Sequence, residues 1–119
     1  MMVLAGADLV LPDRVIERGS LVIRDGRIEA VEARVIDGPA GSTRVDCSGH
    51  LIAPGFIDVH VHGVEGIDVL DGGSAVAEVA GRLPKFGVTA FCPTSVACTP
   101  STLAALLAAV QAAGASRAP

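Results

Sequence analysis

Two histidines placed two residues apart are the most informative side chains of this sequence. His60 and His62 lie near the end of residues 56–62, which alternate in the manner of a β-strand. Side chains at i and i+2 of a strand project to the same side, about 6.6 Å apart at ~3.3 Å per residue. Two such imidazoles can converge on one ion, because Zn–N bonds are about 2.0–2.1 Å long. The spacing favours a metal site, although interior histidines held only by hydrogen bonds would give the same pattern.

The two faces of this predicted strand differ in character. Asp58 lies two residues before His60 on the same face. It could orient a ligand histidine by a hydrogen bond without binding the metal itself. Ile57, Val59 and Val61 make the other face purely aliphatic, and we expect them to pack outward against helices in the full-length protein. The histidines end the strand, and in parallel α/β folds that end is where active sites form.

The remaining candidate side chains have plainer interpretations. We expect His50 to be solvated in a glycine-rich turn and Cys92 to be a small core residue. Glu65, Asp68 and Asp71 could reach a site, but the pattern favours a solvated loop. The sequence contains no Ser/His/Asp triad, Walker A motif or GxGxxG fingerprint.

From residue 54 onward the pattern predicts alternating strands and helices. The expected strands are residues 56–62 and 88–92. Ser74 is a plausible N-cap of the first helix, which Pro84 should kink or end near Leu83. Thr99–Pro100 has the residue types that start a second helix. Strand, helix, strand, helix with short links predicts a parallel sheet.

The first 53 residues read instead as short strands and turns. Asp25–Gly26 separates two apolar runs, and this dipeptide favours a type I′ hairpin in which both residues have φ > 0. We expect a small β-layer, mainly antiparallel.

Composition excludes several classes of protein. The 119 residues carry a net charge of −4 and are 50% hydrophobic, which excludes intrinsic disorder. A single lysine and no basic run argue against nucleic-acid binding. The uncharged residues 86–116 are interrupted by prolines and favour a buried helix over a membrane span. Three cysteines without a CxxC pair, and no export signal, predict a cytoplasmic protein.

The charges are distributed unevenly along the chain. Residues 1–60 hold 15 charged side chains, whereas residues 61–119 hold 7. A free-standing domain needs a polar surface all round, so we expect the second half to pack against protein that lies outside this chain.

Two stretches resemble a known group of enzymes. Residues 54–63, PGFIDVHVHG, resemble the first-strand signature of the amidohydrolase superfamily, and the hairpin of residues 21–31 is similar to its N-terminal β-sandwich. Residues 62–68 followed by Asp71, and residues 87–95, are similar to motifs of the N-acetylglucosamine-6-phosphate deacetylase family within it. The resemblance covers about residues 1–113.

The resemblance implies an α/β fold made of two parts. Residues 1–53 would be the N-terminal part of a β-sandwich. Residues 54–119 would be the start of a metal-dependent hydrolase barrel, the first two βα units of a (β/α)8 TIM barrel. A whole barrel takes about 250 residues, so we expect this chain to be the N-terminal third of the enzyme.

The resemblance also implies a reaction. It is the deacetylation of N-acetylglucosamine 6-phosphate to glucosamine 6-phosphate and acetate, a step of amino-sugar catabolism. His60 and His62 would bind a divalent ion, zinc or iron, with one or two ions per full-length chain. The other ligands and the catalytic Asp lie on later strands of the family. We therefore expect no catalytic residue in this chain, no activity from it alone, and a homo-oligomer of the full-length enzyme.

Two alternatives remain open at this stage. Another amidohydrolase acting on a cyclic amide or an amino-acid derivative would share the first-strand signature. A non-catalytic module or split subunit would contribute structure to a partner without a site of its own.

Overall fold

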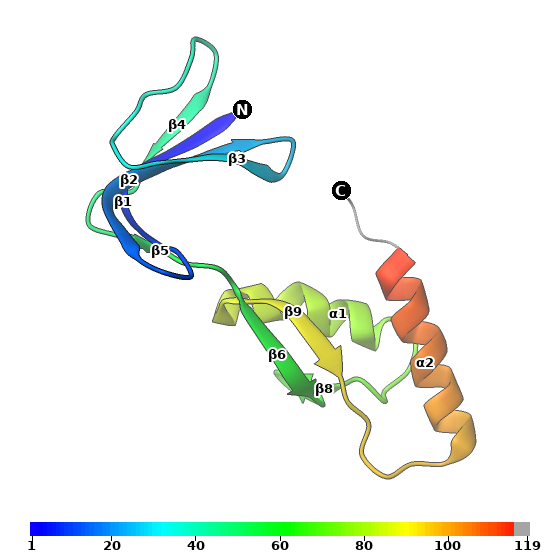
Figure 1. Cartoon of the computed structure of the whole chain (residues 1–119). Helices are drawn as coiled ribbons and strands as arrows, with labels where there is room; N and C mark the ends of the chain where they lie inside the picture. Colours follow the sequence, from blue (N-terminus) through cyan, green and yellow to red (C-terminus); the bar gives the residue numbers. More distant parts are fainter. Residues whose placement is uncertain (116–119) are drawn as a thin grey trace. The chain divides into compact units, whose positions relative to one another are not determined.

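The chain forms two compact units, Met1–Pro54 and a second that begins at Gly55 (Figure 1). The computed structural model describes residues 1–115. The predicted barrel segment, 54–119, therefore has its last residues, 116–119, outside the described residues. No helix within residues 1–115 is long and apolar enough to cross a membrane.

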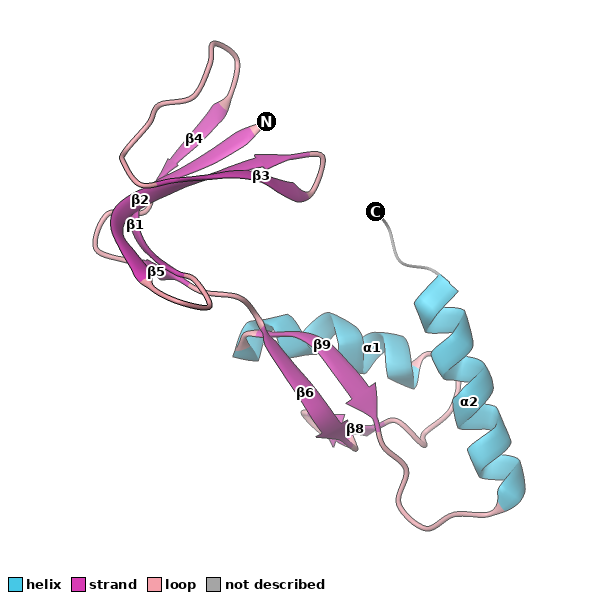
Figure 2. Ribbon diagram, in the orientation of Figure 1, coloured by secondary structure: helices cyan, strands magenta, loops and turns pink. Residues whose placement is uncertain are grey.

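The first unit is a five-stranded sheet (Figure 2). Its strands are β1 (Met2–Val10), β2 (Val15–Arg24), β3 (Arg27–Glu32), β4 (Thr43–Asp46) and β5 (Leu51–Ile52). The order is β3-β2-β1-β4, and β5 also pairs with β1. β1 and β3 run antiparallel to β2, as expected, but β4 and β5 run parallel to β1. The sheet is therefore mixed rather than antiparallel throughout.

The predicted hairpin and the alternation of β1 account for this sheet. Asp25 has φ 49° and Gly26 has φ 72°, the two positive values that a type I′ turn requires. The pairing Arg24↔Arg27 closes the turn, so this prediction is confirmed. Every second residue of β1 is buried on one face of the sheet; the set is Val3, Ala5, Ala7 and Leu9.

The second unit alternates strands and helices, as the sequence predicts. β6 (Phe56–Val61) and β9 (Val88–Pro93) pair in parallel. Between them lie the small hairpin of β7 (Gly63–Val64) and β8 (Ile67–Asp68), the helix α1 (Ala75–Arg82) and the 3-10 turn η1 (Leu83–Phe86). The helix α2 (Pro100–Ala115) follows β9.

The helix boundaries follow from local chemistry, with one exception. Pro84 ends α1 at Arg82, and Gly87, at φ 79°, closes the 3-10 turn that follows. The Thr99 hydroxyl oxygen accepts the Thr102 backbone N–H (3.2 Å), which caps α2. The exception is Ser74, whose hydroxyl donates to the Glu78 carboxylate (2.6 Å) and caps no backbone group.

The core of the second unit lies between the strands and the helices. Its buried members are Val61, Val69, Val76, Val79, Leu83 and Leu106. Val61 is 6% exposed, whereas Ile57 and Val59 on the same strand are 70% and 71% exposed. Of the aliphatic face formed by Ile57, Val59 and Val61, this chain buries Val61, because its core reaches only that end of β6.

Candidate metal centre

The end of β6 is held in place by backbone hydrogen bonds to two neighbouring segments. The Thr94 N–H donates to the Val61 carbonyl and the Val69 N–H donates to the His62 carbonyl, both at 2.8 Å. Gly63 is required here, because a Cβ on it would lie 2.0 Å from the Ile67 carbonyl oxygen. The backbone on both sides of His62 is therefore tightly constrained.

The two imidazoles converge, as the i, i+2 spacing predicts. His60 Nε2 lies 3.0 Å from His62 Nε2, and the ring planes meet at 76°. Two nitrogens bound to one ion at about 2.1 Å cannot be more than about 4.2 Å apart, so this pair fits a shared ion. His60 is exposed and His62 is half-buried, which leaves the pair accessible from solvent.

A backbone carbonyl orients the second histidine. His62 Nδ1 lies 2.8 Å from the carbonyl oxygen of Thr94, which follows β9 directly. A carbonyl oxygen can only accept a hydrogen bond, so Nδ1 is the donor in this contact. This arrangement is typical of metal-ligating histidines, whose other nitrogen donates to a carboxylate or carbonyl.

Asp58 does not play the orienting role suggested by the sequence. Its Oδ1 accepts a hydrogen bond from the His60 backbone N–H (3.1 Å) and so fixes the strand rather than an imidazole ring. Thr94 was missed because its contribution comes from a backbone atom. The available signal was position, because Thr94 follows the neighbouring parallel strand at the same end of the sheet.

Glu65 is exposed in the β7–β8 turn, as a solvated loop predicts, and it belongs to an ion-pair cluster there. It pairs with Lys85 and with Arg82 Nη1 (3.2 Å), joining the β7–β8 turn to the end of α1. The hydrogen bond from Lys85, followed by that from Arg82, holds the pKa of the Glu65 carboxyl below its ordinary range. The Glu65 carboxylate therefore already pairs with two cationic side chains.

Asp68 and Asp71 stabilise the loop after the hairpin. Asp68 Oδ1 accepts the Leu70 N–H (2.8 Å), and Asp71 Oδ2 accepts the Asp68 N–H (2.9 Å). Within residues 1–115, no third His, Cys, Asp or Glu joins a metal-binding group of three or more. The described residues therefore provide a histidine pair and no third member of such a group.

Two further candidates lie at the surface. His50 is exposed, as expected, with its Nδ1 3.1 Å from the Ser48 carbonyl oxygen. Cys92 is also exposed, so its predicted place in the core is wrong.

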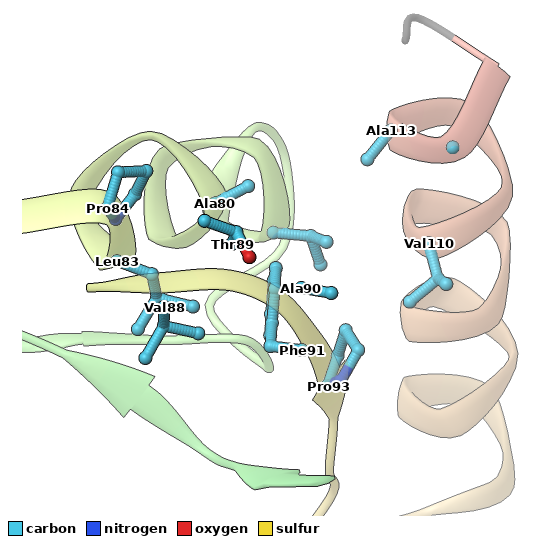
Figure 3. Close-up of a pocket in the computed structure, with 12 residues that line it drawn as sticks. Ala80, Leu83, Pro84, Val88, Thr89, Ala90, Phe91, Pro93, Val110 and Ala113 are labelled. Carbon is cyan, nitrogen blue, oxygen red and sulfur yellow. The ribbon is translucent and has the colours of Figure 1, made fainter. Parts of the chain in front are cut away.

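An apolar pocket of about 240 Å³ opens between α1, β9 and α2 (Figure 3). Its lining includes Leu83, Val88, Phe91 and Val110 but neither histidine. Ligand sites need polar groups that fix orientation, and the pocket's one side-chain hydroxyl is that of Thr89. The pocket is a gap in helix packing rather than part of the candidate site.

Comparison with known proteins gives related sequences and folds. No family model matches the chain. It is 40% identical over 102 residues to human N-acetylglucosamine-6-phosphate deacetylase, which covers 82% of this chain and 24% of that protein. It is also 40% identical, over 76 residues, to imidazolonepropionase from Klebsiella pneumoniae, covering 64% of this chain and 17% of that protein.

The fold comparison agrees with the longer of these matches. The crystal structure of N-acetylglucosamine-6-phosphate deacetylase from Pasteurella multocida has a TM-score of 0.88 and 19% identity, covering 98% of this chain and 31% of that one. At that identity the likeness concerns the fold. The chain spans about a quarter of the length of the curated relatives that it matches. The sequence match and the fold agree: the chain is similar over 82% of its length to an N-acetylglucosamine-6-phosphate deacetylase and shares the fold of another.

Proposed function

We propose that this chain supplies the first metal-binding strand of an N-acetylglucosamine-6-phosphate deacetylase. In this proposal residues 54–119 are the first two βα units of a (β/α)8 barrel, and residues 1–53 are part of its β-sandwich. The parallel pair β6–β9, each strand followed by a helix, supports the first assignment. The five-stranded sheet before Pro54 supports the second.

The observation that carries the proposal is the histidine pair. Its two Nε2 atoms are 3.0 Å apart at the end of β6, in a chain 40% identical to a deacetylase. His60 and His62 would hold the ion, which we expect to be zinc or iron. A divalent ion bound there would activate water and polarise the amide carbonyl.

The proposed reaction is the hydrolysis of one amide bond. Water adds its oxygen to the acetyl carbon of N-acetylglucosamine 6-phosphate, the C–N bond breaks, and the nitrogen leaves as the amine of glucosamine 6-phosphate with acetate as the second product. This chain's own part is to hold and orient. The Thr94 carbonyl fixes the His62 ring, and the Asp58 carboxylate secures the backbone of His60.

The comparisons favour a deacetylase over the other amidohydrolase activity that the sequence left open. The match to imidazolonepropionase covers less of this chain than the deacetylase match, so another amidohydrolase activity is not favoured. We propose an amino-sugar phosphate as the small-molecule substrate and a homo-oligomer as the assembled state of the full-length enzyme. The three cysteines are free, which supports a cytoplasmic location.

A chimera tests the proposal directly. The segment of the human relative that matches this chain is replaced by this chain, and acetate release from N-acetylglucosamine 6-phosphate and metal content are measured. The double variant, His60→Ala with His62→Ala, should lose bound metal. If the site holds two ions, its turnover should also fall by orders of magnitude. His50→Ala is the matched control, because His50 is exposed and contacts Ser48 instead of the pair.

The two readouts separate the possible roles of the pair. Loss of one ion with retained turnover would indicate that the essential ion is held by ligands outside this chain. Unchanged metal content and unchanged turnover in the double variant would show that the histidine pair is structural and that the proposed site is wrong.

A further inference from the structure

We propose that Thr94 is a positioning residue, whose backbone carbonyl fixes His62 as the Nδ1–H tautomer before any metal binds. The inference rests on the proposed function, because the role given to this tautomer is to leave Nε2 free to bind the metal. The two claims can nevertheless fail separately, because the tautomer is measurable in the metal-free chain.

The hydrogen bond itself defines the tautomer. His62 Nδ1 and the Thr94 carbonyl oxygen are 2.8 Å apart and the contact is partly buried. The oxygen has no proton to give, so a neutral His62 must carry its proton on Nδ1. Free histidine prefers its proton on Nε2, so the carbonyl selects the less common form.

Thr94 can act this way because its own position is fixed. Its N–H donates to the Val61 carbonyl (2.8 Å), one residue before His62. Its hydroxyl donates to the Cys92 carbonyl (3.1 Å), and Pro93 restricts the backbone just before it. Hydrogen bonds to β6 and to β9 therefore hold Thr94 in place, with its carbonyl beside the His62 ring.

His60 is not constrained in the same way. Among residues 1–115, the hydrogen-bond partner of its ring is His62 Nε2, at 3.0 Å. Since His62 Nε2 presents a lone pair, the proton between the rings in the neutral, metal-free pair belongs to His60 Nε2. Metal binding therefore requires His60 to move its proton to Nδ1, whereas His62 is ready as it stands. The pair is asymmetric: His62 already has the tautomer that binds a metal through Nε2, whereas His60 must change its tautomer.

Histidine-labelled NMR of the 119-residue chain tests this asymmetry. The spectra are recorded in solution, or on a hydrated solid where the chain associates, and assigned with His50→Ala and His60→Ala. We expect His62 to be the Nδ1–H tautomer with and without Zn²⁺. We expect His60 to change from Nε2–H to Nδ1–H when Zn²⁺ is added.

Variants of the loop connect the tautomer to Thr94. Thr94→Gly removes the hydroxyl bond to Cys92 and frees the backbone, so His62 should become a tautomer mixture. Zn²⁺ affinity should fall by about 10–100-fold, the usual effect of losing such an outer partner. Thr94→Ser keeps a hydroxyl and should restore both properties. Ser95→Gly loosens the same loop without altering the residue that contacts His62, and it should resemble the wild type.

The outcomes discriminate between the two claims. A metal-free wild type with His62 as Nε2–H would overturn the inference, as would a Thr94→Gly variant with unchanged tautomer and unchanged affinity. A His62 held as Nδ1–H by Thr94, in a chain whose histidine pair binds no Zn²⁺, would support the inference, and the metal content of the chimera would then decide the proposed metal site.

Discussion

Replacing Val61 with aspartate should unfold the second unit, whereas the same change at Val59 should leave it folded. The two residues lie on one strand and differ in burial, with exposed fractions of 6% and 71%. Val61 packs in the core cluster with Val79 and Leu83. The two variants therefore place the same substitution at a buried and at an exposed position of β6.

The magnitudes decide the outcome. Losing a buried valine costs about 1.5–3 kcal/mol, and burying a carboxylate without a partner costs several kcal/mol more. A unit of this size has a free energy of unfolding of about 3–9 kcal/mol, at 0.05–0.15 kcal/mol per residue. Val61→Asp should therefore consume most or all of the stability of the second unit. Val59→Asp, at an exposed position, should change it by no more than about 0.5 kcal/mol.

The assay must suit a chain without Trp or Tyr, so intrinsic fluorescence is of little use. Urea unfolding followed by far-ultraviolet circular dichroism gives the overall loss. Amide hydrogen exchange read by mass spectrometry assigns that loss to the residues after Gly55. Equal losses in both variants, or a Val61→Asp chain with wild-type protection in α1 and β9, would refute the reasoning from burial.

Four shorter predictions follow from the same structure. Gly63→Ala should cost about 1–3 kcal/mol in a melting experiment because its Cβ would meet the Ile67 carbonyl, whereas Gly81→Ala, with open space around it, should be neutral or stabilising. The depressed pKa of Glu65 means that its stabilisation is present at neutral pH and lost as the pH falls through the folded-state pKa, so the denaturation midpoints of the wild type and Glu65→Gln should converge in acid. The chain should self-associate through its exposed apolar side chains, and sedimentation of a monodisperse monomer would contradict this. The chain alone should release no acetate from N-acetylglucosamine 6-phosphate, because two histidines are fewer than the three protein ligands of a typical catalytic zinc site.

Elements governed by local chemistry could be predicted from the sequence. The positive φ angles at Asp25 and Gly26 follow from the turn that joins β2 to β3. The end of α1 near Pro84 follows from the missing backbone N–H of proline. Each of these depends on a few adjacent residues, so no knowledge of the rest of the fold was needed.

Features that depend on distant segments could not be predicted in this way. β4 and β5 pair in parallel with β1 across a large separation in sequence, and their short strands give no signal of direction. The exposure of Val59 likewise depends on what packs beside β6, which alternation of residue types cannot show. Local pattern assigns a residue to a face, and only the neighbouring elements determine whether that face is covered.

The candidate site combines both kinds of information. The convergence of His60 and His62 was predictable, because it needs only the two-residue repeat of one strand. The orientation of His62 was not, because it depends on a carbonyl 32 residues later in the chain, and every residue type has a carbonyl. The parallel pairing of β6 with β9 supplies the missing step, since it brings Thr94 beside the end of β6. The histidine pair therefore owes its spacing to one strand, whereas His62 owes its orientation to the carbonyl that follows the next parallel strand.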